Sequence, residues 1–193
     1  MCFVLIATER LSMSLDCVEF ELPGLELTVV ETGWRPWKSK FKRHHYLRDA
    51  GPMAFSTAFT GFVGDDAVCF IGISGMVVGK GRREARVCRM VTCPEYQGAG
   101  VGMAFLEFIC ERELRGEGFI GKPTTTIMHS SHPALVVSLL RNPKWRALKG
   151  SQRLHGGGKE NITGMGQHLR AVAGFRYYGE QGVRAAKREK ITA

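Results

Sequence analysis

The spacing of apolar residues along the chain predicts a mixture of strands and helices. Residues 26–34 are rich in β-branched side chains, and two longer apolar runs, at 53–63 and 67–78, flank the turn signal "GDD". We expect all three segments to be strands, with the last two paired as a hairpin. A further strand is expected over residues 86–93, ending at Pro94.

Two later segments have the apolar spacing of amphipathic helices. They cover residues 102–115 and 132–142, and the second follows an expected strand at 124–131. A third helix is expected between Pro36, which suits a first helical position, and Gly51.

The C-terminal part of the sequence carries weaker patterns. After residue 142 the chain is expected to be mostly loop, with a final strand over residues 168–179 and a basic tail at 181–193. Strands therefore occur both in hairpins and joined by helices. This order predicts an α/β (α+β) fold, with a mixed central sheet flanked by helices in one domain of residues 1–180.

The charge and the cysteine content of the chain indicate its class of partner and its cellular location. Among 193 residues, 27 are Lys or Arg and 18 are Asp or Glu, which gives a net charge of +9. This balance favours an acidic partner such as a nucleic acid, a phosphate-rich ligand or an anionic surface, although a simply basic protein is compatible with it. Six cysteines without a CxxC pair indicate reduced thiols and a cytoplasmic location. No apolar run reaches the roughly 18 residues of a membrane span, and the N-terminus lacks the basic region of a signal peptide.

The stretch "QGAGVG", residues 97–102, lies between an expected strand and an expected helix. The first turn of a helix has unpaired backbone N–H groups and a partial positive charge, and glycines let that backbone approach an anion closely. No Lys-Ser or Lys-Thr follows, so this is not a Walker A loop, and the glycines are out of register for GxGxxG. The alternative is a tight turn that binds nothing.

With Gln97, Gly100 and Gly102, this loop fills the pattern Q/R-x-x-G-x-G/A and resembles the GNAT acyltransferase superfamily. The resemblance covers roughly residues 27–178 and is specific mainly over 86–141. It implies that the loop amides hold the pyrophosphate of acetyl-CoA and that the preceding strand binds the pantetheine arm. The cofactor-binding residues so implied are Met90, Val91, Thr92, Gln97, Gly98, Ala99, Gly100, Val101 and Gly102.

The string "FKRHHYL", residues 41–47, adds a finer resemblance. Adjacent histidines on a basic helix are ordinarily surface residues. Together with the glycine loop and "SSHPAL", however, the string resembles a GNAT subgroup of phages and mobile elements that includes the Mom-type DNA-modifying proteins. This implies that His44 or His45 acts as a base or orients a nucleophile, and that Tyr46 donates a proton.

The helix at 132–142 lacks the tyrosine that typical GNAT enzymes use to protonate the departing CoA thiolate. Ser138 lies near the expected place. Tyr46, Ser130, Ser138 or a histidine could substitute, or the thiolate could leave unaided, because a thiol has a pKa of about 8.5. Ser130 and the serine after it could instead cap the helix. His129 and His132 form an HxxH pair, which we expect to line the substrate pocket rather than to bind a metal.

Basic clusters with interleaved aromatic residues suit a surface that follows a nucleic-acid backbone. The substrate contacts expected from these patterns are Arg43, Arg86, Arg89 and His132. The sequence thus predicts an acetyl-CoA-dependent acyltransferase acting on an amino group of a DNA base. A GNAT enzyme acting on a small amine, peptide or protein is the alternative, and a non-catalytic nucleic-acid-binding module is a third hypothesis. A homodimer is compatible with the sequence, which does not fix the oligomeric state.

Overall fold

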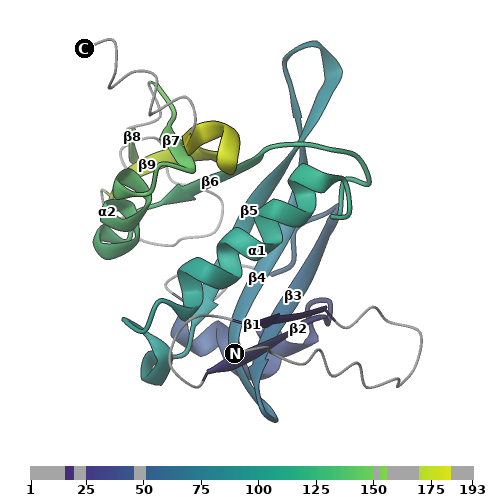
Figure 1. Ribbon diagram of the computed structural model, residues 1–193, viewed down its shortest axis with the longest axis vertical. Coiled ribbons are helices and arrows are strands. Elements are labelled where there is room, and N and C mark those ends of the chain that lie inside the picture. The colour runs from purple at the N-terminus through teal and green to yellow at the C-terminus, as the bar shows by residue number, and fades with distance from the viewer. Residues whose placement is uncertain (1–15, 20–24, 46–50, 150–152, 156–169, 184–193) are drawn as a thin grey trace.

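Figure 1 shows the computed structural model of the chain, which describes residues 16–19, 25–45, 51–149, 153–155 and 170–183. The strands are β1 (Asp16–Glu19), β2 (Glu26–Glu31), β3 (Ser56–Val63), β4 (Asp66–Val78), β5 (Arg82–Thr92), β6 (Thr126–Ser130), β7 (Trp145–Ala147), β8 (Arg153–His155) and β9 (Arg170–Tyr177). The helices are α1 (Val101–Arg115) and α2 (Pro133–Arg141), with the short turns η1 (Trp37–Phe41), η2 (Lys42–His44), η3 (Gly79–Gly81) and η4 (Pro94–Tyr96).

The strands of the described residues form one mixed sheet in the order β1-β2-β3-β4-β5-β6-β9-β7, with β8 also pairing with β9. Neighbours from β1 to β5 are antiparallel. β5 and β6 are parallel, because α1 carries the chain back across the sheet before β6 begins. β9 then lies antiparallel between β6 and β7. This arrangement confirms the predicted α+β class.

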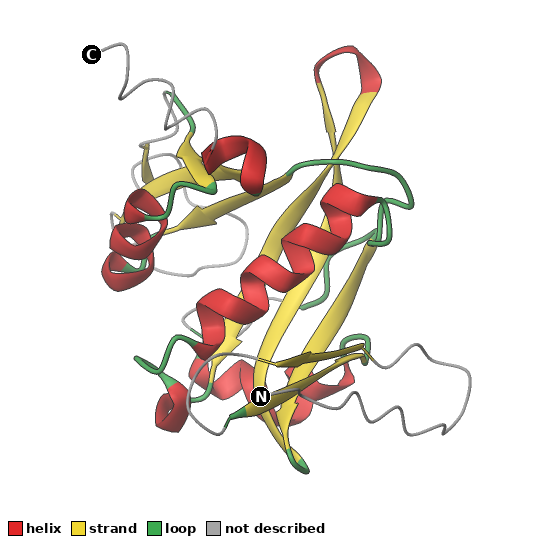
Figure 2. Cartoon of the chain, viewed as in Figure 1, coloured by secondary structure: helices red, strands yellow, loops and turns green. Residues whose placement is uncertain are grey.

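Apolar side chains fill both faces of the sheet. On one face, the buried stripe of α1, which includes Phe105 and Ile109, packs on the central strands at Ile71 and Val87, and Figure 2 shows α1 lying along these strands. On the opposite face a second cluster consists of Trp37, Phe41, Ala58, Phe70, Val91 and Cys93. The turns η1 and η2 therefore cover the lower part of the face that α1 does not touch.

The segments with strong periodicity match their predictions. β3, β6, α2 and β9 lie within the expected ranges, and β4 and α1 each begin one residue before theirs. The strand expected over residues 86–93 is longer at its start, because β5 already begins at Arg82, and it ends at Thr92. Residues 180–183 form a helical turn, and the rest of the predicted tail lies outside the described residues.

The helix expected between Pro36 and Gly51 is wrong in extent and type. The segment forms a π-helical turn and then a 3₁₀ turn that ends at His44, and His45 has extended backbone angles (φ −100°, ψ 141°). Burial of Trp37 and Phe41 against the sheet fixes the first turn, and His45, where the backbone becomes extended, packs its ring against Trp37.

Within the described residues, no helix is long and apolar enough to cross a membrane. Cys69, Cys88, Cys93 and Cys110 are free thiols.

Candidate active site

The site is built where the parallel strands β5 and β6 part. Their pairing runs from Ala85–Thr126 to Val87–Met128 and then stops, although β5 continues to Thr92. At this point β5 contains an extra residue, because Ile73 of β4 pairs with Val87 whereas Gly72 pairs with Arg89.

The extra residue is Cys88, whose thiol donates a hydrogen bond to the carbonyl oxygen of Gly72 at 3.2 Å. Such a bulge bends its strand. β5 and β6 therefore diverge, as Figure 1 shows, and no strand of the described ranges pairs with β5 from Cys88 to Thr92 on the β6 side.

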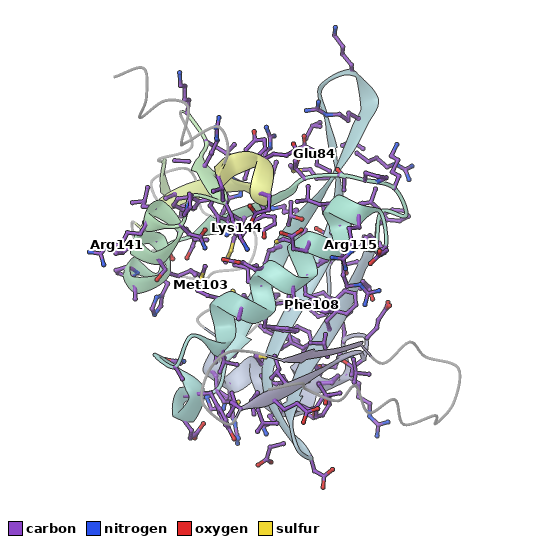
Figure 3. All side chains as sticks on the ribbon, in the orientation of Figure 1. Glu84, Met103, Phe108, Arg115, Arg141 and Lys144 are labelled. Atoms are coloured by element: carbon purple, nitrogen blue, oxygen red, sulfur yellow. The ribbon has the colours of Figure 1, made fainter. Side chains whose placement is uncertain are left out.

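A cavity of about 610 Å³ lies at this parting. It is lined on the α1 face of the sheet by Met103, Met128, Ser130, Leu135 and Ser138, and on the opposite face by His44, His45, Cys88, Arg89 and His129. In Figure 3, Met103 projects from the N-terminal half of α1 toward α2. The cavity therefore reaches both faces of the sheet, which allows two reactants to meet between the strands.

The glycine loop forms the floor of the cavity at the start of α1. Gly98 and Gly100 have φ angles of 85° and 83°, a left-handed conformation that side chains disfavour. Gly100 is the N-cap and offers no side-chain acceptor, and the first helical bond runs from Ala104 N to Gly100 O at 3.1 Å. Within the described part of the chain, the N–H groups of residues 101–103 accordingly have no hydrogen-bond acceptor. Three donors at a helix N-terminus suit an anion.

Two other loop residues hold this geometry in place. The side-chain amide of Gln97 donates to the carbonyl oxygen of Thr92 at 2.9 Å and so ties the loop to the end of β5. A methyl group at Gly102 would lie 2.6 Å from Thr92 Oγ1. Gly102 is therefore required for close packing of α1 on β5, a role that the sequence analysis did not assign to it.

Of the predicted cofactor-binding residues, the cavity is lined by Met90, Val91, Thr92, Gln97, Gly98, Gly100 and Gly102. Ala99 does not line it, and the Val101 side chain is fully buried in the core beneath α1. Only the backbone N–H of Val101 remains available to a ligand.

His45 lies on the opposite side of the cavity, between Trp37 and Arg89. Its ring is packed edge-on against Trp37, with centroids 5.1 Å apart, and only 8% of the residue is exposed. Burial, together with the nearby Arg89 guanidinium, lowers the pKa of His45 to about 4. The imidazole is therefore neutral at pH 7, able to accept a hydrogen bond but weak as a base.

His44 is exposed at the rim of the cavity, where its Nε2 accepts a hydrogen bond from Arg43 Nε at 2.9 Å. Arg43 itself is exposed and does not line the cavity. Tyr46, the predicted proton donor, lies outside the described residues.

The β6–α2 junction supplies the remaining wall. Ser130 Oγ accepts a hydrogen bond from the backbone N–H of His132 at 3.1 Å, and His132 Nδ1 accepts from Leu135 N at 3.4 Å. The helix cap is thus His132, and the alternative assignment of capping to the serines is wrong. Ser138 lines the cavity, but its hydroxyl donates to the carbonyl oxygen of Ala134 at 3.0 Å.

No family model matches the sequence, and no curated protein matches it. Several solved structures match the fold. The ribosomal-protein-S18-alanine N-acetyltransferase of Escherichia coli aligns with 78% of this chain and 92% of its own, at 15% identity and a TM-score of 0.52. A GNAT-family acetyltransferase of Streptococcus pneumoniae (12% identity, TM-score 0.52) and an IAA acetyltransferase of Bacillus cereus (12% identity, TM-score 0.51) each align with 78% of this chain and 98% of their own.

The chain has the GNAT acetyltransferase fold. This confirms the fold-level resemblance seen in the glycine loop. At these identities the comparison concerns the fold alone, and it carries no information about a phage subgroup.

The GNAT-fold cavity also contains residues that the sequence analysis did not select. Cys88, Tyr96, Met103 and Met128 line it. Tyr96 adjoins Gln97 in the sequence and could have been included with the loop. Cys88 could not, because its place depends on strand register. Among the described residues, no group of three or more His, Cys, Asp or Glu side chains is arranged to hold a metal ion.

Proposed function

We propose that this GNAT-fold protein is an acyl-CoA-dependent N-acyltransferase. One observation carries the proposal, namely that the open N–H groups of the α1 first turn and the unpaired edge of β5 border the same cavity. The E. coli protein with a similar fold is an N-acetyltransferase, which supports this chemistry.

The residues present fit acetyl-CoA. The N–H groups of residues 101–103, approached over Gly98 and Gly100, would hold the pyrophosphate. The free edge of β5 from Cys88 to Thr92 would hydrogen-bond the amides of the pantetheine arm. When bound, acetyl-CoA supplies an activated acyl group as a thioester.

On the acceptor side, we assign His45 to accept a hydrogen bond from the attacking amine and so to orient it. A buried imidazole with a pKa of about 4 is uncharged at pH 7, so one of its ring nitrogens is a hydrogen-bond acceptor. The Ser138 hydroxyl already donates a hydrogen bond to the carbonyl oxygen of Ala134. We therefore assign protonation of the leaving thiolate to a phenol, that of Tyr46 or that of Tyr96, which lines the cavity.

For the acceptor, we propose an amino group on a nucleic-acid base, as the resemblance to Mom-type proteins implies. The net charge of +9 supports a polyanionic partner. Basic residues also lie on the turns next to His44 and His45, namely Lys38, Lys40, Lys42 and Arg43 on η1 and η2. A base in a duplex would have to leave the stack to enter the cavity. Transfer to a small amine, peptide or protein is the alternative.

Calorimetric titration with acetyl-CoA tests the donor site. Gly100→Val should abolish measurable binding, because its side chain would stand at the helix N-terminus where the anion approaches. Gly64→Val is the matched control, since Gly64 also has a positive φ (57°) but lies in the β3–β4 turn. Equal affinity in the two variants would remove the acyl-CoA assignment.

Salt dependence and product analysis test the acceptor. If about six phosphates are contacted, log K for DNA should fall with log[salt] at a slope near −5. Mass spectrometry of digested DNA from expressing cells should then detect an acylated base. Absence of DNA binding at low salt would favour the small-amine or protein alternative. Acetyl-CoA binding without transfer to any acceptor would indicate a non-catalytic module.

A further inference from the structure

Three arginines on neighbouring strands carry buried, unpartnered donors. The Nε atoms of Arg86, Arg89 and Arg176 are buried and have no hydrogen-bond partner, although each residue is only half-buried as a whole. Arg86 pairs in register with Ile127, and Ile127 with Arg176, so two of the arginines lie in one row across β5, β6 and β9. Two strand spacings separate them, or about 10 Å.

These arginines lie on the face of the sheet opposite α1. The strand neighbours of Arg86, Ala85 and Val87, belong to the core beneath α1, and side chains alternate along a strand. Arg89 lies over the ring of Trp37, 5.9 Å from its centroid, in the cluster on this opposite face. The arginines therefore lie on the histidine side of the cavity, which we have assigned to the acceptor.

Within the described part of the chain, an ion pair neutralises only Arg176 of these three. Glu84 is almost fully buried, and its carboxylate binds Arg176 and Arg82, each at 2.8 Å. Among the described residues, Arg86 and Arg89 have no carboxylate partner. One amino group of Arg89 donates a hydrogen bond to the carbonyl oxygen of Cys88 at 2.6 Å. A buried donor without an acceptor destabilises the fold, so its retention calls for an explanation such as a bound anion.

We propose that Arg86 and Arg89 form an oxyanion subsite that binds an acidic group of the acceptor beside its reacting amine. The inference rests on the proposed N-acyltransferase function and specifies its substrate as an anionic amine. Arg89 lines the cavity next to His45, and Arg86 extends the site along β5 away from it. Two guanidinium groups suit the oxygens of a phosphate, which each can bind through paired N–H donors. For a nucleic-acid acceptor this group is the backbone phosphate. A carboxylate would instead indicate a peptide or an amino acid.

Nuclear magnetic resonance can observe the subsite without turnover. In ¹H–¹⁵N spectra, the Nε–Hε signals of Arg86 and Arg89 should shift saturably when inorganic phosphate is added to the full-length protein. Acetate, added separately, distinguishes a carboxylate preference. Arg115 is the internal control, because it is exposed, ion-paired with Glu117 and lies at the far end of α1 (Figure 3). The phosphate shifts should persist when the protein is saturated with CoA. Their loss would show that the arginines serve the donor's phosphates and would overturn the proposal.

Transfer kinetics give the second test. Arg86→Gln and Arg89→Gln should each lower kcat/KM about 10- to 100-fold for an oligonucleotide acceptor with phosphodiester linkages, and Arg115→Gln should not. The advantage of phosphodiester over uncharged methylphosphonate linkages should disappear in the first two variants.

The two proposals fail in different ways. If wild-type protein does not bind acetyl-CoA, the acyltransferase function is wrong, whatever the arginines do. If acetyl-CoA binds but phosphate and acetate leave the Arg86 and Arg89 signals unmoved, the oxyanion subsite is wrong while the proposed function stands. Equal kinetics for Arg86→Gln, Arg89→Gln and Arg115→Gln would lead to the same conclusion.

Discussion

Gly102→Ala tests whether the third glycine of the loop serves packing or ligand approach. The added methyl group would lie 2.6 Å from Thr92 Oγ1 and 3.3 Å from Met90 Cε. The methionine methyl can rotate away, but Thr92 stands at the end of β5 and its carbonyl anchors Gln97. We therefore expect the N-terminal turn of α1 to be pushed away from the strand.

The magnitude follows from two opposing effects. Replacing glycine by alanine in a helix stabilises it by at most about 1 kcal/mol. Overpacking a close contact costs about 1–3 kcal/mol. With the full gain subtracted, Gly102→Ala should therefore lower the free energy of unfolding by up to about 2 kcal/mol. Adding Thr92→Ala removes the clashing oxygen and leaves the threonine Cβ position at an ordinary 3.7 Å, so the double variant should recover most of the loss.

Urea denaturation of the four proteins in this cycle measures the coupling, provided that the m-value is unchanged. Acetyl-CoA affinity should follow the same pattern, falling in Gly102→Ala and recovering in the double variant, because both depend on the position of the first turn of α1. A Gly102→Ala variant as stable as the wild type, or the absence of coupling with Thr92→Ala, would refute the packing role.

Three further predictions concern titration and catalysis. Burial raises the pKa of Glu113, whose carboxylate accepts the N–H of Phe119 at 2.7 Å. Stability should therefore be greatest below the ordinary glutamate pKa and fall as pH rises through the raised one, a dependence that Glu113→Gln should remove in pH-resolved denaturation. In a pH titration followed by the chemical shifts of its ring protons, the pKa of His45 should rise in Arg89→Gln yet stay below 6.5. An unchanged pKa would exclude the effect of Arg89 on His45. Tyr46→Phe should slow single-turnover transfer by about 10²-fold or more; a loss confined to Tyr96→Phe would move the proton donor to the glycine loop.

Sequence patterns predicted the parts of the fold in which local periodicity and tertiary burial agree. The β3–β4 hairpin and α1 have long apolar repeats, and the core confirms them. The three-residue strands β7 and β8 are too short to show alternation, and pairing with β9 creates them. The helix expected from Pro36 was wrong over its described part, residues 36–45, because burial of Trp37 and Phe41 by the sheet and of His45 against Trp37 fixes shorter turns.

The candidate site also has one part that could be predicted from local sequence and one part that could not. The glycine loop is a local feature, so its residues could be chosen from the sequence, and most of them line the cavity. The meeting of His45 with Arg89 depends on the bulge at Cys88 and on the cluster around Trp37, which join segments more than 40 residues apart. No spacing rule in the sequence contains that information.

The two sides of the cavity differ in how they could bind an anion. On the α1 side, neutral backbone N–H groups and the helix dipole provide the attraction, and these need no cationic side chain. On the opposite side, full guanidinium charges are available, and burial together with the charge of Arg89 lowers the pKa of His45. An acidic acceptor bound at Arg89 would offset that charge and so remove the smaller of the two causes, which would raise the pKa of His45 in part and strengthen the imidazole as a hydrogen-bond acceptor. Binding of the proposed acceptor and the hydrogen-bond strength of His45 are therefore linked through the guanidinium of Arg89. An acceptor without an anionic group should bind more weakly and should leave the pKa of His45 low.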